Sequence, residues 1–254
     1  MTSRKRSAYE ALGAAAYGKR SGRKIPARRR ISYGLPAGQV VGPIGGGKYG
    51  ASKDEKKVSD LAVATYQANT TGAFTLLHVP TLGTDYTNRI GRKTLAKSIY
   101  IRGRVTTEVA AAAGGTTKSV EGQLVRLIVF VDLQPNANNP AIAVTDILNT
   151  ADPASQLNLN NRDRFRILKD KQWCFDPYIV STATNFYASA SRQVYPVKIF
   201  KKCMVESVFN GTNGGSIADL NSGAIYMLTI GSAAAGTNTD ANLIVSTRVR
   251  YVDA

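Results

Sequence analysis

Short runs in which apolar and polar residues alternate fill the chain after residue 57, and Gly, Asn, Pro and Asp separate them. Alternation with a period of two predicts strands, because successive side chains of a strand point to opposite faces of a sheet. In the run from Leu243 to Val252 the polar positions include Ser246, Arg248 and Arg250, so we expect one core face and one wet, basic face. The predicted strands are 58–67, 74–79, 95–109, 123–133, 164–175, 194–203, 204–210, 224–231 and 243–252, and the one predicted helix is 142–148.

Two of these runs, 124–131 and 224–230, are apolar on both faces rather than on one. Such a strand occupies the centre of a sheet or is covered by another subunit. About eight strands with long loops and no alternating helices predict an all-β fold of two sheets packed as a sandwich. A β-barrel with another strand order is the alternative.

The first 56 residues carry a different pattern, in which basic clusters stand between Ala, Gly and Ser. Residues 1–57 hold 14 Lys and Arg against 3 acids, a net charge of +11 out of +16 for the whole chain. Such a segment cannot bury enough apolar surface to offset its ordering entropy, so a disordered arm is expected, and the seven glycines of residues 34–50 are typical of a linker. We therefore divide the chain into a basic arm with a Gly-rich linker, residues 1–56, and a folded domain, residues 57–254.

A block of positive charge of this density gains most by neutralising a polyanion, which makes nucleic acid the expected partner. An anionic membrane is the weaker alternative, and an inert solubilising tail or an RNA-binding extension is another. Lys and Arg contact phosphates without reading bases, so the arm should bind with little sequence preference. Tyr9 and Tyr17 either stack on bases or are merely spaced along a tail. The predicted nucleic-acid-binding residues of the arm are Arg4, Lys5, Arg6, Lys19, Arg20, Arg23, Lys24, Arg28, Arg29 and Arg30.

Two further basic features have more than one interpretation. The clusters at residues 4–6 and 19–24 fit a bipartite nuclear-localisation pattern, although any polybasic segment produces such matches by chance. In the folded domain, alternation predicts that Arg162, Arg164 and Arg166 share one face of a strand. They either line an inner wall that binds nucleic acid or form a solvated or interface-paired row.

No arrangement of residues predicts catalysis, so we expect a protein that is not an enzyme and holds no cofactor or metal. The single His78 stands among apolar residues, where a hydrogen-bonded structural histidine is the expected reading. Cys174 and Cys203 form no metal-ligand spacing, and we expect both to be buried as apolar residues. The chain has no apolar stretch typical of a secretory signal, so a soluble protein without a membrane partner is predicted.

Several segments in a fixed order resemble the capsid proteins of geminiviruses and of related circular Rep-encoding single-stranded DNA viruses. The most specific is 159–168, with an Asn pair followed by Arg162-Asp163-Arg164 and an aromatic residue. It is preceded by the strand-like runs 97–105 and 125–132 and a segment at 145–149, and followed by 197–202, 221–228 and 248–253. No one of these segments is diagnostic alone; their order behind a polybasic arm carries the resemblance.

The resemblance implies an antiparallel, eight-stranded jelly roll whose subunits self-assemble into an icosahedral shell of about 60 copies in the virion. It also implies that the arm packages the single-stranded DNA genome and engages host nuclear-import factors, which places the protein in the host nucleus during assembly. Arg162, Arg164 and Arg166 are the candidate nucleic-acid-binding residues outside the arm. The rival hypothesis is a cellular nucleic-acid-binding β-barrel with a basic tail, and a third is a jelly-roll lectin or enzyme.

Overall fold

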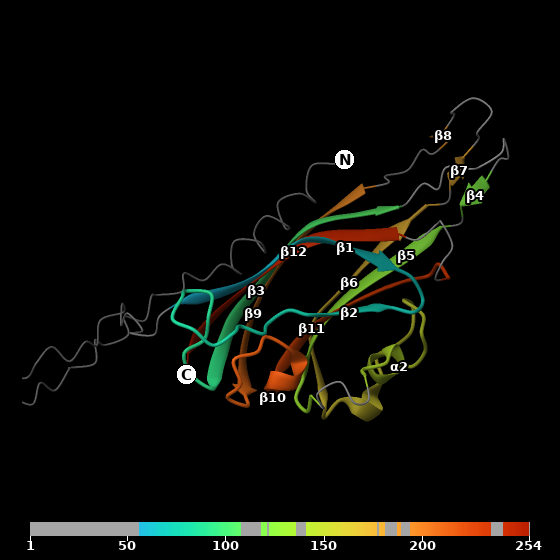
Figure 1. Ribbon diagram of the computed structural model, residues 1–254. Coiled ribbons are helices and arrows are strands. Elements are labelled where there is room, and N and C mark those ends of the chain that lie inside the picture. Colours follow the sequence, from blue (N-terminus) through green and yellow to red (C-terminus); the bar gives the residue numbers. More distant parts are fainter. Residues whose placement is uncertain are drawn as a thin grey trace, which may run out of the picture. The chain divides into compact units, whose positions relative to one another are not determined.

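Two antiparallel sheets packed face to face make up most of the structure (Figure 1). The computed structural model describes residues 56–107, 118–120, 122–135, 141–176, 178–180, 187–188, 194–234 and 241–253. The first sheet has the order β1 (Lys57–Ala68), β12 (Ala241–Asp253), β3 (Lys93–Thr107), β9 (Val194–Phe209) and β10 (Leu220–Ser222). The second has the order β2 (Ala73–Leu76), β11 (Ala224–Gly231), β5 (Gln123–Asp132) and β6 (Phe165–Phe175).

The strand order is that of a jelly roll. If the short β10 is set aside, the first strand pairs with the last (β1 with β12), the second with the seventh (β2 with β11), the third with the sixth (β3 with β9) and the fourth with the fifth (β5 with β6). The chain is thus folded back on itself as one long antiparallel ribbon, and that ribbon is wrapped so that alternate pairs fall in opposite sheets. The predicted all-β, two-sheet jelly roll is confirmed, although β10 brings the two sheets to nine strands rather than eight.

The main core fills the space between the sheets. Val125, Leu127 and Val129 of β5 meet the inward residues of the first sheet, such as Ile99 and Leu243, and all of them are at most 1% exposed. Alternation places these side chains on the inner faces, because strand residues two apart share a face. Burial of this continuous apolar layer is the main stabilising contribution to the domain.

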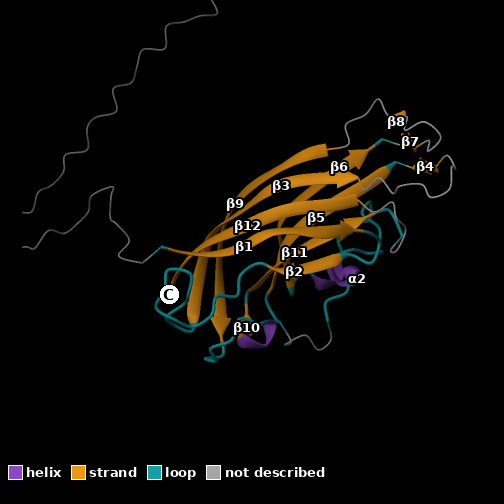
Figure 2. Cartoon of the chain, turned by 45° about the horizontal axis from the view of Figure 1, so that its top comes forward, coloured by secondary structure: helices purple, strands orange, loops and turns teal. Residues whose placement is uncertain are grey.

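A second apolar cluster covers the outer face of β5 and β11. Ile128 and Phe130 of β5 pack there with Leu148 and with Val144 and Ile147 of the short helix α2 (Val144–Ile147). Figure 2 shows this helix beside β2 and β11. The two predicted strands that are apolar on both faces are therefore central in their sheet and covered by the chain's own loop, so their apolar outer face gives no argument for another subunit.

Three local predictions need correction. The runs 194–203 and 204–210 form the single strand β9, in which a register shift and a positive φ of 52° at Met204 mark a bulge. A small third sheet of β4 (Lys118–Val120), β7 (Tyr178–Val180) and β8 (Tyr187–Ala188) was not predicted. Cys174 is exposed and Cys203 only partly buried, because Cys174 lies on the solvent side of β6 and Cys203 beside the bulge of β9.

Candidate nucleic-acid interface

The ten predicted binding residues of the arm lie outside the described residues. They are Arg4, Lys5, Arg6, Lys19, Arg20, Arg23, Lys24, Arg28, Arg29 and Arg30. Their role in binding nucleic acid stays a prediction, and so does the boundary at residue 56.

The three predicted arginines of the folded domain do not share one strand face. Arg162 caps the short 3-10 helix Leu159–Asn161, and its side chain is 75% exposed. Arg164 precedes β6 and is held by Asp132 through two hydrogen bonds of 3.0 Å, with its guanidinium over the Phe165 ring. Only Arg166 lies in β6, where it is exposed. The predicted strand start at residue 164 is one residue early, because a turn ends at Arg164, whose N–H donates to the Asn161 carbonyl.

The hydrogen bonds to Asp132 therefore make Arg164 less available to contact a nucleic-acid phosphate. The carboxylate of Asp132 is 1% exposed, and its hydrogen bond raises the pKa of Arg164 above its usual value. Burial raises the pKa of the neighbouring Tyr226 to about 12, so this phenol stays neutral at physiological pH. Arg164 is a structural partner of Asp132, whereas Arg162 and Arg166 remain open to solvent.

A more extended basic surface lies on the outer face of the first sheet, whose strands β1, β12, β3 and β9 lie side by side in Figure 2. The registers place its side chains in rows, because residues directly opposite in antiparallel strands share a face. One row joins Asp60, Arg248, Tyr100 and Phe200, and the next joins Ser246, Arg102 and Lys198. We call this surface the basic face; it consists of Asp60, Ser98, Tyr100, Arg102, Arg104, Lys198, Phe200, Lys202, Ser246, Arg248 and Arg250.

The basic face carries six cationic side chains and one carboxylate. Asp60 accepts from Arg248 at 2.8 Å and 2.6 Å, an ion pair in which both side chains remain more than a third exposed. Among the described residues no acidic partner lies within ion-pair distance of the other five cations, which are Arg102, Arg104, Lys198, Lys202 and Arg250. The face therefore has a strong positive potential.

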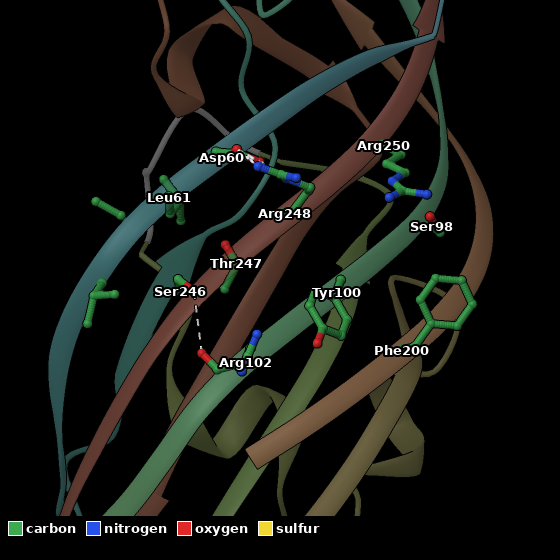
Figure 3. A pocket seen from close by; sticks show the side chains of 12 residues that line it. Asp60, Leu61, Ser98, Tyr100, Arg102, Phe200, Ser246, Thr247, Arg248 and Arg250 are labelled. Carbon is green, nitrogen blue, oxygen red and sulfur yellow. Dashed lines mark hydrogen bonds and ion pairs between the residues drawn. The ribbon is translucent and has the colours of Figure 1, made fainter. Parts of the chain in front are cut away.

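A shallow groove of about 750 Å³ runs over this face (Figure 3). Its lining includes Tyr100 and Phe200, which project from neighbouring strands on the same side of the sheet as Arg102 and Arg248. Two adjoining grooves extend it, one sharing Ser98 and Arg250 and the other sharing Arg102 and Ser246 with it. The three grooves thus adjoin one another along β3 and β12.

Sequence reasoning found only part of this surface. The wet, basic back predicted for the last strand is confirmed, since Arg248 and Arg250 are exposed and Val249 is buried. The same alternation is present in two other runs of the sequence. It places Arg102 and Arg104 on one face of β3, and Lys198 and Phe200 on one face of β9. What the sequence did not contain was the register that brings the three strands side by side.

His78 is a structural histidine, as predicted. Its ring is fully buried, with Nε2 2.9 Å from the Thr94 hydroxyl and its centroid 4.9 Å from that of Tyr251. Burial lowers its pKa to about 3, so it is neutral in the folded protein. Within the described ranges, no group of three or more His, Cys, Asp or Glu side chains is arranged to hold a metal ion, and no helix there is long and apolar enough to cross a membrane.

The strand order defines a jelly-roll protein, an architecture shared by viral capsid and lectin domains. The family model described as the geminivirus coat protein/nuclear export factor BR1 family matches residues 14–254, and the chain belongs to that family. The resemblance seen in the sequence is thereby confirmed. Membership of a coat-protein family supports a structural protein of the virion rather than a catalyst.

Comparisons with other proteins add little to this assignment. No curated protein matches the chain. Among solved structures, the chain is similar to one in "Structure of infectious bursal disease virus Gt strain", with 9% identity, 79% of this chain and 42% of that chain covered, and a TM-score of 0.16. A chain of the T13 viral particle of the same virus gives 12% identity, coverages of 79% and 40%, and a TM-score of 0.14. The chain thus spans about two fifths of those proteins, and TM-scores this low carry no argument about the fold.

Proposed function

We propose that this chain is the subunit of a closed icosahedral shell that packages a single-stranded DNA genome. The observation that carries the proposal is the family match over residues 14–254, which covers the folded domain and most of the basic arm together. A jelly-roll domain supplies a rigid wall unit, and the arm supplies charge for the genome. Self-association through sheet edges and loops is sufficient for such a shell, and no chemistry is required.

The net positive charge of the arm is of a suitable size for neutralising a small genome. If about 60 copies form the smallest closed shell, residues 1–57, each with a net charge of +11, bring roughly 660 positive charges. That number is comparable to a fair share of the phosphates in a small single-stranded genome. Phosphate neutralisation by Lys and Arg is independent of base sequence, so the packaged strand is not selected by the arm.

Particle size tests the proposal most directly. Purified full-length protein incubated with single-stranded DNA should form uniform shells in electron micrographs, and the enclosed DNA should resist nuclease. A monodisperse monomer at high concentration and moderate salt, with the domain folded, would contradict it. Small species that bind DNA would instead support the nuclear export factors that the family description also names, or a cellular nucleic-acid-binding protein.

We further propose that the arm carries the chain into the host nucleus by engaging import factors. Support comes from the clusters at residues 4–6 and 19–24, whose spacing fits a bipartite signal. A fluorescent reporter fused to residues 1–30 should accumulate in the nucleus of eukaryotic cells. The same fusion with Lys5, Arg6, Lys19 and Arg20 changed to Gln should stay cytoplasmic, and a cytoplasmic unmodified fusion would end the proposal.

A further inference from the structure

We propose that the basic face is itself a binding site for single-stranded nucleic acid, in which Tyr100 and Phe200 stack on bases while the surrounding cations contact phosphates. The proposal rests on the proposed function, because it assumes that a nucleic-acid strand is the polyanion this protein meets. It adds a site in the folded domain that is separate from the arm.

The first support is an arrangement of charge that folding alone does not favour. Arg102 and Lys198 lie directly opposite each other on β3 and β9, and like charges in that position are destabilising. Lys202 and Arg250 likewise flank the small Ser98 on either side. A bound row of phosphates removes this repulsion, because each phosphate is shared between neighbouring cations.

The second support is the aromatic pair between these cations. Phe200 is 58% exposed on β9, which is the edge strand of the sheet at this position, and Tyr100 is directly opposite it on the next strand. Neither ring belongs to the two hydrophobic clusters. Exposed aromatic side chains in a positively charged groove are the feature by which proteins hold single strands without sequence preference, since every base has a stacking face.

The third support is the size and shape of the groove. Ser98 to Arg104 spans six residue steps, or about 20 Å at 3.4 Å per step, which accommodates about six phosphates at the spacing of a stacked strand. Three adjoining grooves cover that length, and Tyr100 and Phe200 line the central one (Figure 3). It is shallow and open, as a chain that lies along a sheet requires.

Charge decides between the possible occupants. A second copy presenting the same face would bring six more cations against six, and the chain's own arm is also strongly basic, so both are repelled. Bases in a duplex are already stacked and offer no face to Tyr100 and Phe200. A single strand satisfies both the charges and the rings.

Base stacking can be tested separately from charge with two probes on the full-length protein. The probes are a fluorescent oligodeoxythymidylate of 15 nucleotides and an abasic strand with the same number of phosphates. The unmodified protein should bind the oligodeoxythymidylate more tightly than the abasic strand. The double variant Tyr100→Leu with Phe200→Leu should weaken binding of the oligodeoxythymidylate by about 5- to 150-fold per lost stack and leave binding of the abasic strand unchanged. Phe200→Trp should retain the preference, and Leu159→Ala, at a position 70% exposed elsewhere, should change neither probe.

The cations are tested through the dependence of affinity on salt. Arg102→Gln or Lys198→Gln should each reduce the slope of log affinity against log salt by about 0.7, and the double variant by about 1.4. Lys169→Gln removes a charge that is also exposed, but on the other sheet, and should leave the slope unchanged. An equal effect of Lys169→Gln would mean that only net charge matters and would overturn the site.

A gain of binding gives an independent check. Asp60→Asn removes the carboxylate that occupies Arg248, so the variant should bind the oligonucleotide more tightly and with a slope steeper by about 0.7. If the unmodified protein binds the oligonucleotide but the ring variants and Asp60→Asn match it on both probes, the face is not a binding site, and the shell proposal still stands. If the ring variants change particle size without changing affinity, the face is a protein interface. Absence of both binding and shells in the unmodified protein would instead reject the proposed function.

Discussion

Arg89 is a fully buried guanidinium that holds together one end of the domain. Its Nε donates to the Pro80 carbonyl at 3.2 Å, and its two terminal nitrogens donate to the carbonyls of Gly91 at 2.8 Å and Thr212 at 2.6 Å. The Phe209 ring lies 4.3 Å below it. The β2–β3 loop, which supplies two of these carbonyls, and the β9–β10 loop are thus tied to one planar group, which a single ammonium cannot replace.

Arg89→Lys should therefore be destabilising despite the conserved charge. Lys has one donor centre where Arg has a fork, so at least one buried carbonyl loses its partner and the stacking on Phe209 is lost. We expect a loss of about 2–4 kcal/mol in the free energy of unfolding, measured by urea denaturation. Arg104→Lys, on the exposed basic face, should change stability by less than about 0.5 kcal/mol, and an equal loss in both variants would contradict this account.

His78 should make the domain less stable in mild acid. Its pKa is about 3 in the folded protein because of burial, against about 6.5 when unfolded, so below pH 6.5 the unfolded state binds a proton that the folded state refuses. Stability then falls by about 1.4 kcal/mol per pH unit, or about 2 kcal/mol between pH 6.5 and 5. His78→Gln should remove this part of the pH dependence in urea titrations at pH 7.5 and pH 5. An unchanged dependence would show that other groups, such as the Asp219 carboxyl with its lowered pKa, account for all of it.

At the scale of elements, one arginine attaches the loop that covers the second sheet. Arg126 lies on the outer side of β5, where Nε and one terminal nitrogen bind Asp170 of β6 at 3.0 Å and 2.6 Å. The other terminal nitrogen donates to the carbonyls of Pro153 and Ser155 in the covering loop, at 3.0 Å and 2.5 Å. Arg126, the charged residue within this otherwise apolar strand, thus attaches the covering loop to the second sheet.

Arg126→Leu should release that loop while the jelly roll stays folded. The loop carbonyls lose their donors, so the helix α2 should separate more often from Ile128 and Phe130. We expect faster amide hydrogen exchange in residues 144–158, and binding of a hydrophobic dye, at a cost of about 2 kcal/mol. Arg162→Gln, whose side chain is 75% exposed near the same loop, should leave exchange unchanged. Protected amides in Arg126→Leu would show that apolar packing alone holds the cover.

The sequence predicted strands well wherever alternation or apolar runs are long. Strands β1, β3, β11 and β12 lie within two residues of their predicted bounds, because a core face imposes the period of two. The bulge at Met204 left no such signal, so one strand was divided into two. The three-residue β10 is too short to carry a period at all.

Side-chain partners were harder to predict than strands. The pairing of Arg164 with Asp132 depends on β5 and β6 being neighbours, and the basic face depends on the register of four strands. Both are long-range properties, and local spacing does not encode them. For the same reason the apolar outer sides of β5 and β11 fitted a subunit interface and a covering loop equally well.

At the scale of the whole molecule, we expect the arm and the basic face to make separable contributions to DNA binding. Residues 1–30 hold ten Lys and Arg and one acid, and they precede every strand of the domain. Their deletion should leave folding intact and greatly weaken binding to single-stranded DNA. Removing even half of the arm's phosphate contacts should flatten the salt slope by about 3 to 4 units, measured by fluorescence titration over a range of salt.

Substitution of Arg28, Arg29 and Arg30 by Ala is the milder form of this test. It should weaken binding to all sequences alike, because phosphate contacts carry no base information. Shells of the deleted protein should form but remain empty. Full affinity with an unchanged slope after deletion would assign the genome entirely to the folded domain.

The pairing of the first strand with the last also determines the order in which the chain can fold. Lys57 pairs with Tyr251 across almost 200 residues, and β12 lies between β1 and β3. The five-stranded sheet therefore cannot close until Ala241–Asp253 has been synthesised, and contacts of such long sequence separation form slowly. A ribosome that stops early releases a chain with two unpaired strand edges, which invite aggregation rather than assembly. Only a polypeptide translated through its last strand can complete this sheet.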